Sequence, residues 1–230
     1  MWIETTSDDE ALLAKKLALS VKKELTQCIK DKGKACLAVS GGSTPILFFQ
    51  HLSEQELAWN KVTIILVDER WVASTDKHSN EKLVRDHLLK NQAKQAYFLG
   101  LKNDAALPSE GIMDCETQLR TQVEHVDVVI LGMGLDGHTA SWFSGSKQLP
   151  ALLDSDTSAW CLPVEDDFLE QPRMSLTWRF IKRAQKIYVH FTGTEKNQVF
   201  INACKGVTEQ LPISHLLHQD VININVYKTV

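Results

Sequence analysis

The sequence of 230 residues predicts an α/β fold with a mostly parallel sheet and helices on both faces. Short apolar runs typical of buried strands alternate with segments whose apolar residues recur every three or four positions. Alternation of this kind favours parallel strands, because each crossover between them needs a connection that a helix usually supplies. No internal repeat, low-complexity tract or linker interrupts the pattern, so we expect one domain spanning residues 1–230.

Helical spacing predicts the first helix at residues 8–30. Its apolar positions are Leu12, Leu13, Leu17, Val21, Leu25 and Ile29. A short apolar strand at 34–42 follows and stops at a glycine pair. The chain then restarts as a helix at 43–57, with Pro45 in its first turn, where a missing N–H is tolerated.

The same two signals define the later elements. A second buried strand at 61–71 ends in charged residues, and the strongest strand signal lies at 127–134. Between them we expect a helix at 79–90, a strand at 96–100 and a helix at 108–124. Beyond them we expect strands at 159–164, 174–178, 186–193 and 221–227, and helices at 194–205 and 212–218.

Three of these strands end in polar segments. The segments are "SGGSTP" at 40–45, "VDERW" at 67–71 and "GMGLDGHTAS" at 132–141. In sheets of this class the ligand lies at the carboxyl ends of the strands, where the loops emerge. We therefore expect the three segments to meet at one edge of the sheet and form a binding site.

The segment "SGGSTP" has the features of a phosphate site. Gly41 and Gly42 allow the backbone to approach a ligand closely, and Ser43 and Thr44 add hydroxyl groups. The helix that follows presents free N–H groups and the positive end of its dipole. The alternative is a tight strand-to-helix turn in which Ser43 or Thr44 serves only as the N-cap.

Basic residues are concentrated between positions 171 and 205, where seven of them accompany one acid. Most such runs are solvated helix faces. Arg173 and Lys196 differ because each lies where a loop borders an element. We expect these two side chains to contact a bound anion, Arg173 through its planar fork and Lys196 as a point charge.

The segment "VDERW" places charged side chains at the end of a buried strand. Because side chains alternate along a strand, Asp68 and Arg70 share one face and Glu69 takes the other. Asp68 and Arg70 either pair with each other at the strand end or, in a cleft, orient a sugar and offset negative charge.

The segment "GMGLDGHTAS" predicts a general base. Histidine titrates near neutral pH, so His138 can take a proton from water and return it to a leaving oxygen. Asp136, two positions earlier, is suited to orient the imidazole. A lone histidine is more often structural, but flanking glycines, a nearby acid and a position after a strand favour catalysis.

Other chemistries are weaker. The G-x-G of this segment lacks the third glycine and the acid of a dinucleotide fingerprint, so we exclude NAD. His215 and His218 are three residues apart on a short helix but have no further zinc ligand near them in the sequence. The residues therefore give no support for NAD and little for a zinc site. No cysteine lies in a glycine-rich or basic turn, which argues against a cysteine nucleophile.

The overall composition restricts partners and compartment. A formal net charge of −4 gives no field that would attract nucleic acid or an anionic membrane, so we expect neither as a partner. No apolar run is long enough to span a membrane, and the N-terminus lacks the pattern of a signal peptide. The five cysteines are widely spaced, so we expect reduced, mostly buried thiols in a cytoplasmic protein. The oligomeric state is left open.

Five segments, taken in order, resemble the motifs of the 6-phosphogluconolactonase family. They are "LAVSGGSTP", "VDERWV" with the following "HSN", "LGMGLDGHTASWFSGS", "PRMSLT" and "FTGTEK". The resemblance runs from about residue 35 to about residue 200, and five motifs in one order are far more specific than one. Many members of the family carry proline at the position of Ser144, which is a minor departure from the motif.

The resemblance implies the fold shared with glucosamine-6-phosphate deaminase and ribose-5-phosphate isomerase. It also implies hydrolysis of 6-phospho-D-glucono-1,5-lactone to 6-phosphogluconate in the oxidative pentose phosphate pathway, in the cytosol and without cofactor or metal. In this chemistry His138 would activate water, Asp136 would fix its tautomer, and Arg70 or loop N–H groups would hold the oxyanion. The partner is then a small sugar phosphate lactone.

Two alternatives remain. A related deaminase or isomerase would need an acid shortly after the histidine, as in the "F-N-E-P" run of the deaminases, but this chain has "SWFSG" there. A non-catalytic sugar-phosphate sensor of the same fold would carry a DNA-binding module, and the sequence offers no segment that we expect to form one.

Overall fold

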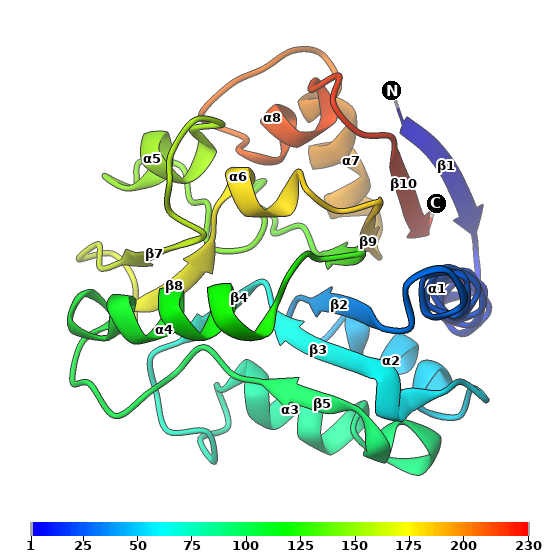
Figure 1. Ribbon diagram of the computed structural model, residues 1–230. Helices are drawn as coiled ribbons and strands as arrows, with labels where there is room; N and C mark the ends of the chain where they lie inside the picture. Colours follow the sequence, from blue (N-terminus) through cyan, green and yellow to red (C-terminus); the bar gives the residue numbers. More distant parts are fainter. Residues whose placement is uncertain (1, 230) are drawn as a thin grey trace.

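A seven-stranded parallel sheet forms the centre of the computed structural model, which describes residues 2–229 (Figure 1). The strands run in the order β1 (Trp2–Ser7), β10 (Ile224–Thr229), β9 (Lys186–Phe191), β6 (Val128–Leu131), β2 (Ala35–Val39), β3 (Val62–Leu66) and β5 (Tyr97–Leu99). Every neighbouring pair is parallel. The predicted fold class is confirmed.

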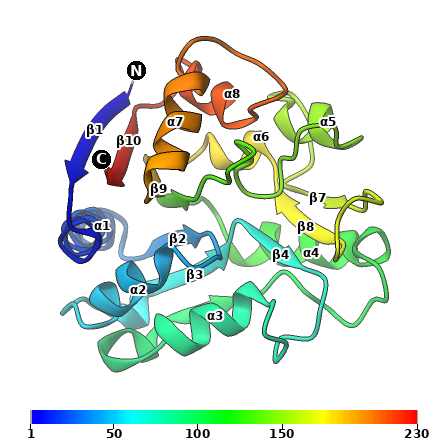
Figure 2. The same cartoon turned by 180° about the vertical axis from the view of Figure 1, so that it is seen from behind.

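The helices that connect these strands cover the sheet (Figures 1 and 2). They are α1 (Glu10–Lys32), α2 (Pro45–Ser53), α3 (Asn80–His87), α4 (Pro108–Gln122), α5 (Leu149–Leu153), α6 (Trp178–Ile181), α7 (Thr194–Ala203) and α8 (Ile213–Leu217). Phe48 of α2 packs against His190, whereas Phe200 of α7 packs against the next residue of β9, Phe191. Because successive side chains of a strand point to opposite faces, α2 and α7 cover opposite faces of the sheet.

Local signals determine the long first helix. The Asp9 carboxylate caps the start of α1 by accepting from the backbone N–H groups of Ala11 and Leu12, at 2.8 and 3.2 Å. The helix ends at Gly33, whose φ of 78° suits a left-handed C-cap. The leucines and Val21 of the predicted stripe are buried, apart from Leu12, which is exposed.

A second, antiparallel sheet corrects the prediction of one strand at 61–71. This sheet has the order β4 (Asp68–Arg70), β8 (Arg173–Leu176) and β7 (Cys161–Val164). The N–H of Val67 donates to Val39 in the parallel sheet, while its C=O accepts from Leu176 of β8. The chain therefore changes hydrogen-bonding partners at Val67, and the predicted strand divides into β3 and β4.

Other differences concern elements with little apolar periodicity. The predictions contained neither β1, an edge strand with exposed residues, nor the short helices α5 and α6. The last strand was predicted at 221–227 and lies at Ile224–Thr229. The helix predicted at 43–57 ends early, at Ser53, and a turn of 3₁₀ helix then covers Trp59–Lys61.

Within residues 2–229, no helix combines the length and the apolar character that a membrane crossing requires. The five cysteines are free thiols and four of them are buried, as expected.

Candidate active site

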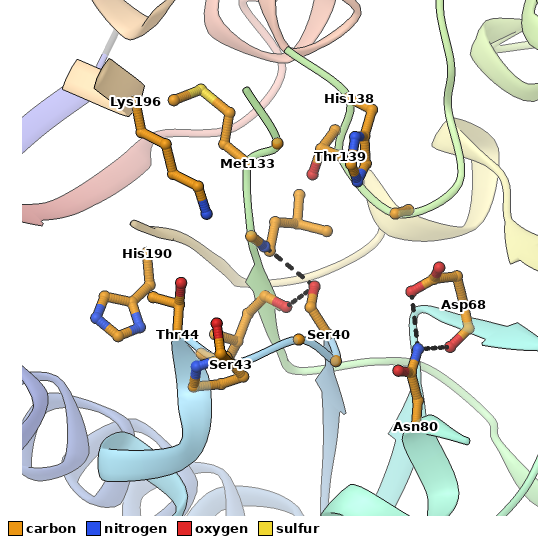
Figure 3. A pocket seen from close by; sticks show the side chains of 18 of the residues that line it. Ser40, Ser43, Thr44, Asp68, Asn80, Met133, His138, Thr139, His190 and Lys196 are labelled. Carbon is orange, nitrogen blue, oxygen red and sulfur yellow. Dashed lines mark hydrogen bonds between the residues drawn. The ribbon is translucent and has the colours of Figure 1, made fainter. Parts of the chain in front are cut away.

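A cavity of about 240 Å³ opens at the carboxyl ends of β2 and β6, next to β4 (Figure 3). Residues of "SGGSTP", "VDERW" and "GMGLDGHTAS" line it together, so the three segments meet as the sequence predicted. The lining includes nine of the ten predicted site residues. They are Gly41, Gly42, Ser43, Thr44, Asp68, Arg70, His138, Arg173 and Lys196. The tenth, Asp136, contacts His138 from outside the lining.

His138 and Asp136 form the predicted pair. Oδ1 of Asp136 lies 2.5 Å from Nδ1 of His138 and also accepts from the His138 backbone N–H at 3.2 Å. Burial raises the pKa of Asp136, but hydrogen bonding and the charge of His138 outweigh it and lower the pKa below its usual range. The ring of Phe143 packs on the imidazole, with the centroids 4.6 Å apart. Nδ1 is therefore occupied, and Nε2 is the nitrogen left for chemistry.

Steric constraints explain why glycines stand at two positions of this loop. A Cβ at Gly134 would overlap the His138 ring and the Asp136 carboxylate. Gly137 has φ of 73°, a conformation that favours glycine. The tight loop is closed by a hydrogen bond of 2.9 Å from the Gly134 N–H to the His138 carbonyl. The loop thus holds the base and its carboxylate next to the end of β6.

The turn before α2 forms another wall of the cavity. The Ser40 hydroxyl donates to Ile130 and accepts from the Gly132 N–H, which ties the ends of β2 and β6 together. Gly42 has φ of 92°, and Thr44 at the N-cap position makes no side-chain hydrogen bond to the helix. No side chain thus caps the first turn of α2, and Gly41, Gly42, Ser43, Thr44 and Pro45 border the cavity. Lys196, from the first turn of α7, lies close by (Figure 3).

Asp68 joins several parts of the site. Its carboxylate accepts from the Ser141 hydroxyl at 2.7 Å and lies 3.4 Å from the amide nitrogen of Asn80. It also pairs with Arg173, at 3.6 Å. Of the two alternatives for Asp68 and Arg70, a pair between them is not found among residues 2–229. The Arg70 guanidinium donates instead to the backbone carbonyl of His78, at 2.7 Å. The salt bridge of Asp68 with Arg173 therefore joins two strands, β4 and β8.

Glu69 points away from the cavity, as strand alternation predicted. Its carboxylate accepts from the backbone N–H groups of Arg70, Asn80 and Glu81 and from the Ser79 hydroxyl. These contacts anchor the start of α3. Burial raises the pKa of Glu69 to about 7, against the opposing effect of the three backbone hydrogen bonds.

Sequence reasoning did not assign roles to several residues of the cavity. Asn80 and Thr139 lie within two of the five family-like motifs of the sequence, whereas His190 lies within an apolar strand. Within the described part of the chain, the Thr139 hydroxyl and both ring nitrogens of His190 are buried without a hydrogen-bond partner. The Arg173 guanidinium lies over the Phe143 ring, 5.2 Å from its centroid. Whether a buried polar group has a hydrogen-bond partner can be seen only in the three-dimensional structure.

The His215 and His218 pair lies outside this cavity. Nε2 of His218 is 3.0 Å from the carbonyl of Ala203. Across residues 2–229, no three His, Cys, Asp or Glu side chains are grouped closely enough to hold a metal ion.

Comparisons with known proteins identify the family of this chain. Residues 8–224 match the family model described as glucosamine-6-phosphate isomerases/6-phosphogluconolactonase. A 6-phosphogluconolactonase of Rhizobium meliloti is 37% identical over 221 residues, covering 96% of this chain and 95% of that protein. A crystal structure of a 6-phosphogluconolactonase from Shewanella baltica superposes with a TM-score of 0.96 at 36% identity, covering 100% of this chain and 98% of that one.

A more distant structure supports the fold alone. A monomeric glucosamine-6-phosphate deaminase superposes with a TM-score of 0.77 at 17% identity, covering 97% of this chain and 96% of that one. The predicted likeness to the deaminase fold is therefore confirmed. With the family match over nearly the whole chain, the conclusion is that this chain belongs to the glucosamine-6-phosphate isomerase/6-phosphogluconolactonase family.

Proposed function

We propose that this chain hydrolyses 6-phospho-D-glucono-1,5-lactone to 6-phosphogluconate, with water activated by His138. The observation that carries the proposal is the 2.5 Å contact between Asp136 and Nδ1 of His138, which directs the basic nitrogen of the ring to Nε2. The names of the similar proteins support the same substrate.

The chemistry needs one base that later acts as an acid. Nε2 of His138 takes a proton from water while the water oxygen attacks the lactone carbonyl carbon. The resulting tetrahedral oxyanion collapses, the bond from this carbon to the ring oxygen breaks, and the imidazolium returns the proton to that oxygen. The Asp136 carboxylate stabilises the imidazolium between the two transfers, as in other base–carboxylate pairs.

A positive group is needed to stabilise the oxyanion. Arg70 borders the cavity, and one of its nitrogens is already held by the His78 carbonyl, which fixes the direction of the guanidinium. We propose Arg70 and the N–H groups of the His138 loop for this role. Asp68 has both carboxylate oxygens engaged, so we propose that it positions Arg173 and Ser141 instead of transferring a proton.

The phosphate end of the substrate requires an anion site. Gly41, Gly42, Ser43 and Thr44 supply backbone and hydroxyl donors at the start of α2, where the helix dipole favours negative charge. Lys196 supplies a positive charge there. Burial lowers the pKa of Lys196, so a bound dianion also stabilises the charged form of this side chain. We propose that Arg173, on the Asp68 side, adds to the attraction.

An activity assay on three substrates tests the proposal. Freshly prepared 6-phosphogluconolactone should be hydrolysed, glucono-lactone without phosphate should react much less efficiently, and glucosamine-6-phosphate should release no ammonia. Activity should survive treatment with EDTA. Ammonia release at a comparable rate would mean that the chain is a deaminase, and a loss in EDTA that zinc restores would show a metal requirement. No turnover of any of the three would leave a sensor as the better interpretation.

A further inference from the structure

His190 is a buried polar side chain without a partner. It lies in the second half of β9, 3% of its surface is exposed, and it borders the cavity. A neutral imidazole carries one donor and one acceptor nitrogen. In the described chain neither nitrogen has a hydrogen-bond partner, and water does not reach either of them. An unpaired buried group of this kind destabilises a fold, so its presence calls for an explanation.

Packing alone does not require a histidine at this position. The neighbours of His190 on β9 are apolar or aromatic, and its ring meets the edge of Phe48 with the centroids 6.4 Å apart. A leucine would fill a site of this kind without unpaired polar atoms. The ring also adds no buried charge, because burial and the neighbouring Lys196 lower the pKa of His190 to about 4.

The position of His190 coincides with the proposed phosphate site. His190, Thr44 and Lys196 lie on one side of the cavity, across from His138 and Asp68 (Figure 3). A neutral N–H beside an ammonium group and a helix N-terminus suits a phosphoryl oxygen, because every group there is a donor and the ligand offers only acceptors. Binding requires the ring to turn so that one nitrogen faces the cavity, which His190 already borders.

We propose that His190 is a phosphate-binding residue, which donates its ring N–H to a phosphoryl oxygen of the substrate beside Thr44 and Lys196. This inference deepens the proposed function and rests on it. The hydrogen bond forms only when the ligand binds, so His190 destabilises the free protein and strengthens the complex. A residue that merely fills the core would have the opposite effect on stability.

The test compares His190→Leu with the wild type in two assays that do not depend on each other. We expect the Kd for 6-phosphogluconate, measured by calorimetry, and the KM for 6-phosphogluconolactone each to rise about tenfold, the range of one hydrogen bond to a charged group. The value of kcat should stay within about twofold, since one binding contact is lost uniformly. The melting temperature without ligand should be unchanged or higher. The kinetic parameters for glucono-lactone should not change.

His215→Leu is the matched control. Nε2 of His215 is also buried without a partner within residues 2–229, but this residue does not border the cavity. We expect no change in Kd or KM for this variant. An equal rise in both variants would mean that the loss is not specific to the phosphate site and would overturn the proposal.

The other outcomes are equally decisive. An unchanged Kd in His190→Leu, or a lower melting temperature with equal losses on both lactones, would assign His190 to the core and overturn the proposal. If this variant fails to fold, the wild type still decides, because the His190 ring N–H resonance should shift downfield on addition of inorganic phosphate, and no shift would refute the contact. A wild type that binds 6-phosphogluconate through His190 but hydrolyses no lactone would refute the proposed function and leave this inference intact.

Discussion

Replacing Asp136 by asparagine tests how the catalytic base is supported. Asparagine keeps an oxygen near Nδ1 of His138 but removes the negative charge that favours the imidazolium. The two side chains are 56% and 32% exposed, so solvent screens their interaction. Two unit charges about 4 Å apart interact by ~1 kcal/mol in water and ~4 kcal/mol at an effective dielectric constant of 20. A half-exposed pair lies near the lower value.

We therefore expect Asp136→Asn to lose about 1–2 kcal/mol of transition-state stabilisation, which corresponds to a fall in kcat of about 5- to 30-fold. The KM for 6-phosphogluconolactone should change little, because Asp136 does not line the cavity. The assay is the initial rate of hydrolysis of fresh lactone at saturation. Raising the salt concentration should narrow the gap between wild type and variant, since exposed charges are screened.

A double-mutant cycle with His138→Ala completes this test. If Asp136 acts through the imidazole, adding Asp136→Asn to His138→Ala should cause no further loss. A kcat within twofold of wild type for Asp136→Asn would show that the carboxylate is dispensable. A further loss in the His138→Ala background would show that Asp136 acts on the substrate or the loop by itself.

Four further variants test other parts of the site. His138→Ala should lower kcat by about 10²- to 10⁴-fold with KM nearly unchanged; a variant within about threefold of wild type would exclude His138 as the base. Lys196→Ala should raise KM for the phosphorylated lactone roughly tenfold and leave glucono-lactone unaffected, whereas equal losses on both would mean a structural role. Arg173→Ala should raise the same KM and also lower the melting temperature by several degrees, because it leaves the buried carboxylate of Asp68 without its cation; unchanged melting would contradict the importance of the pair. Glu69→Gln should flatten the pH dependence of stability. Glu69 has a pKa of about 7 in the native state and 4.5 in the unfolded chain, so the native state binds more protons between these pH values. The free energy of unfolding of the wild type therefore falls by up to ~3 kcal/mol as the pH rises from 4.5 through 7. Urea titrations of both proteins at pH 5 and pH 8 measure this change in the free energy of unfolding. A wild type that gains stability from pH 5 to pH 8 would show that the hydrogen bonds to Glu69 affect its pKa more than its burial does.

The parallel sheet and the cavity could be predicted because their signals are local. The short apolar run before Gly132, rich in β-branched residues, is typical of a buried strand, and the glycines of "GLDGHTAS" indicate a tight loop by themselves. The partition between the two sheets could not be predicted. It depends on Val67 bonding to Val39 on one side and to Leu176 on the other, and neither partner is near Val67 in the sequence.

The site shows the same division between local and distant contacts. Asp136 and His138 are two residues apart, and their contact follows from the loop that holds them. A pair between Asp68 and Arg70, two residues apart, was one of two alternatives, but the antiparallel pairing of β4 with β8 brings Arg173 to Asp68 instead. His190 gave no signal, because an unpaired imidazole in an apolar strand has the same sequence pattern as a satisfied one.

The two ends of the cavity differ in how their polar groups are paired before substrate arrives. Around Asp68, the Ser141 hydroxyl, the Asn80 amide and Arg173 are held by one carboxylate, so this end is already ordered. At the other end, Thr44 caps nothing and His190 bonds to nothing among the described residues, so donors remain available. Chemistry gains from groups fixed before the reaction, because no energy is then spent on ordering them in the transition state. Binding gains from groups that are satisfied only by the ligand, because their full hydrogen-bond energy appears on association. The proposed phosphate end therefore serves as the handle that holds the substrate, while the Asp68 end and the His138 loop keep the geometry in which water attacks.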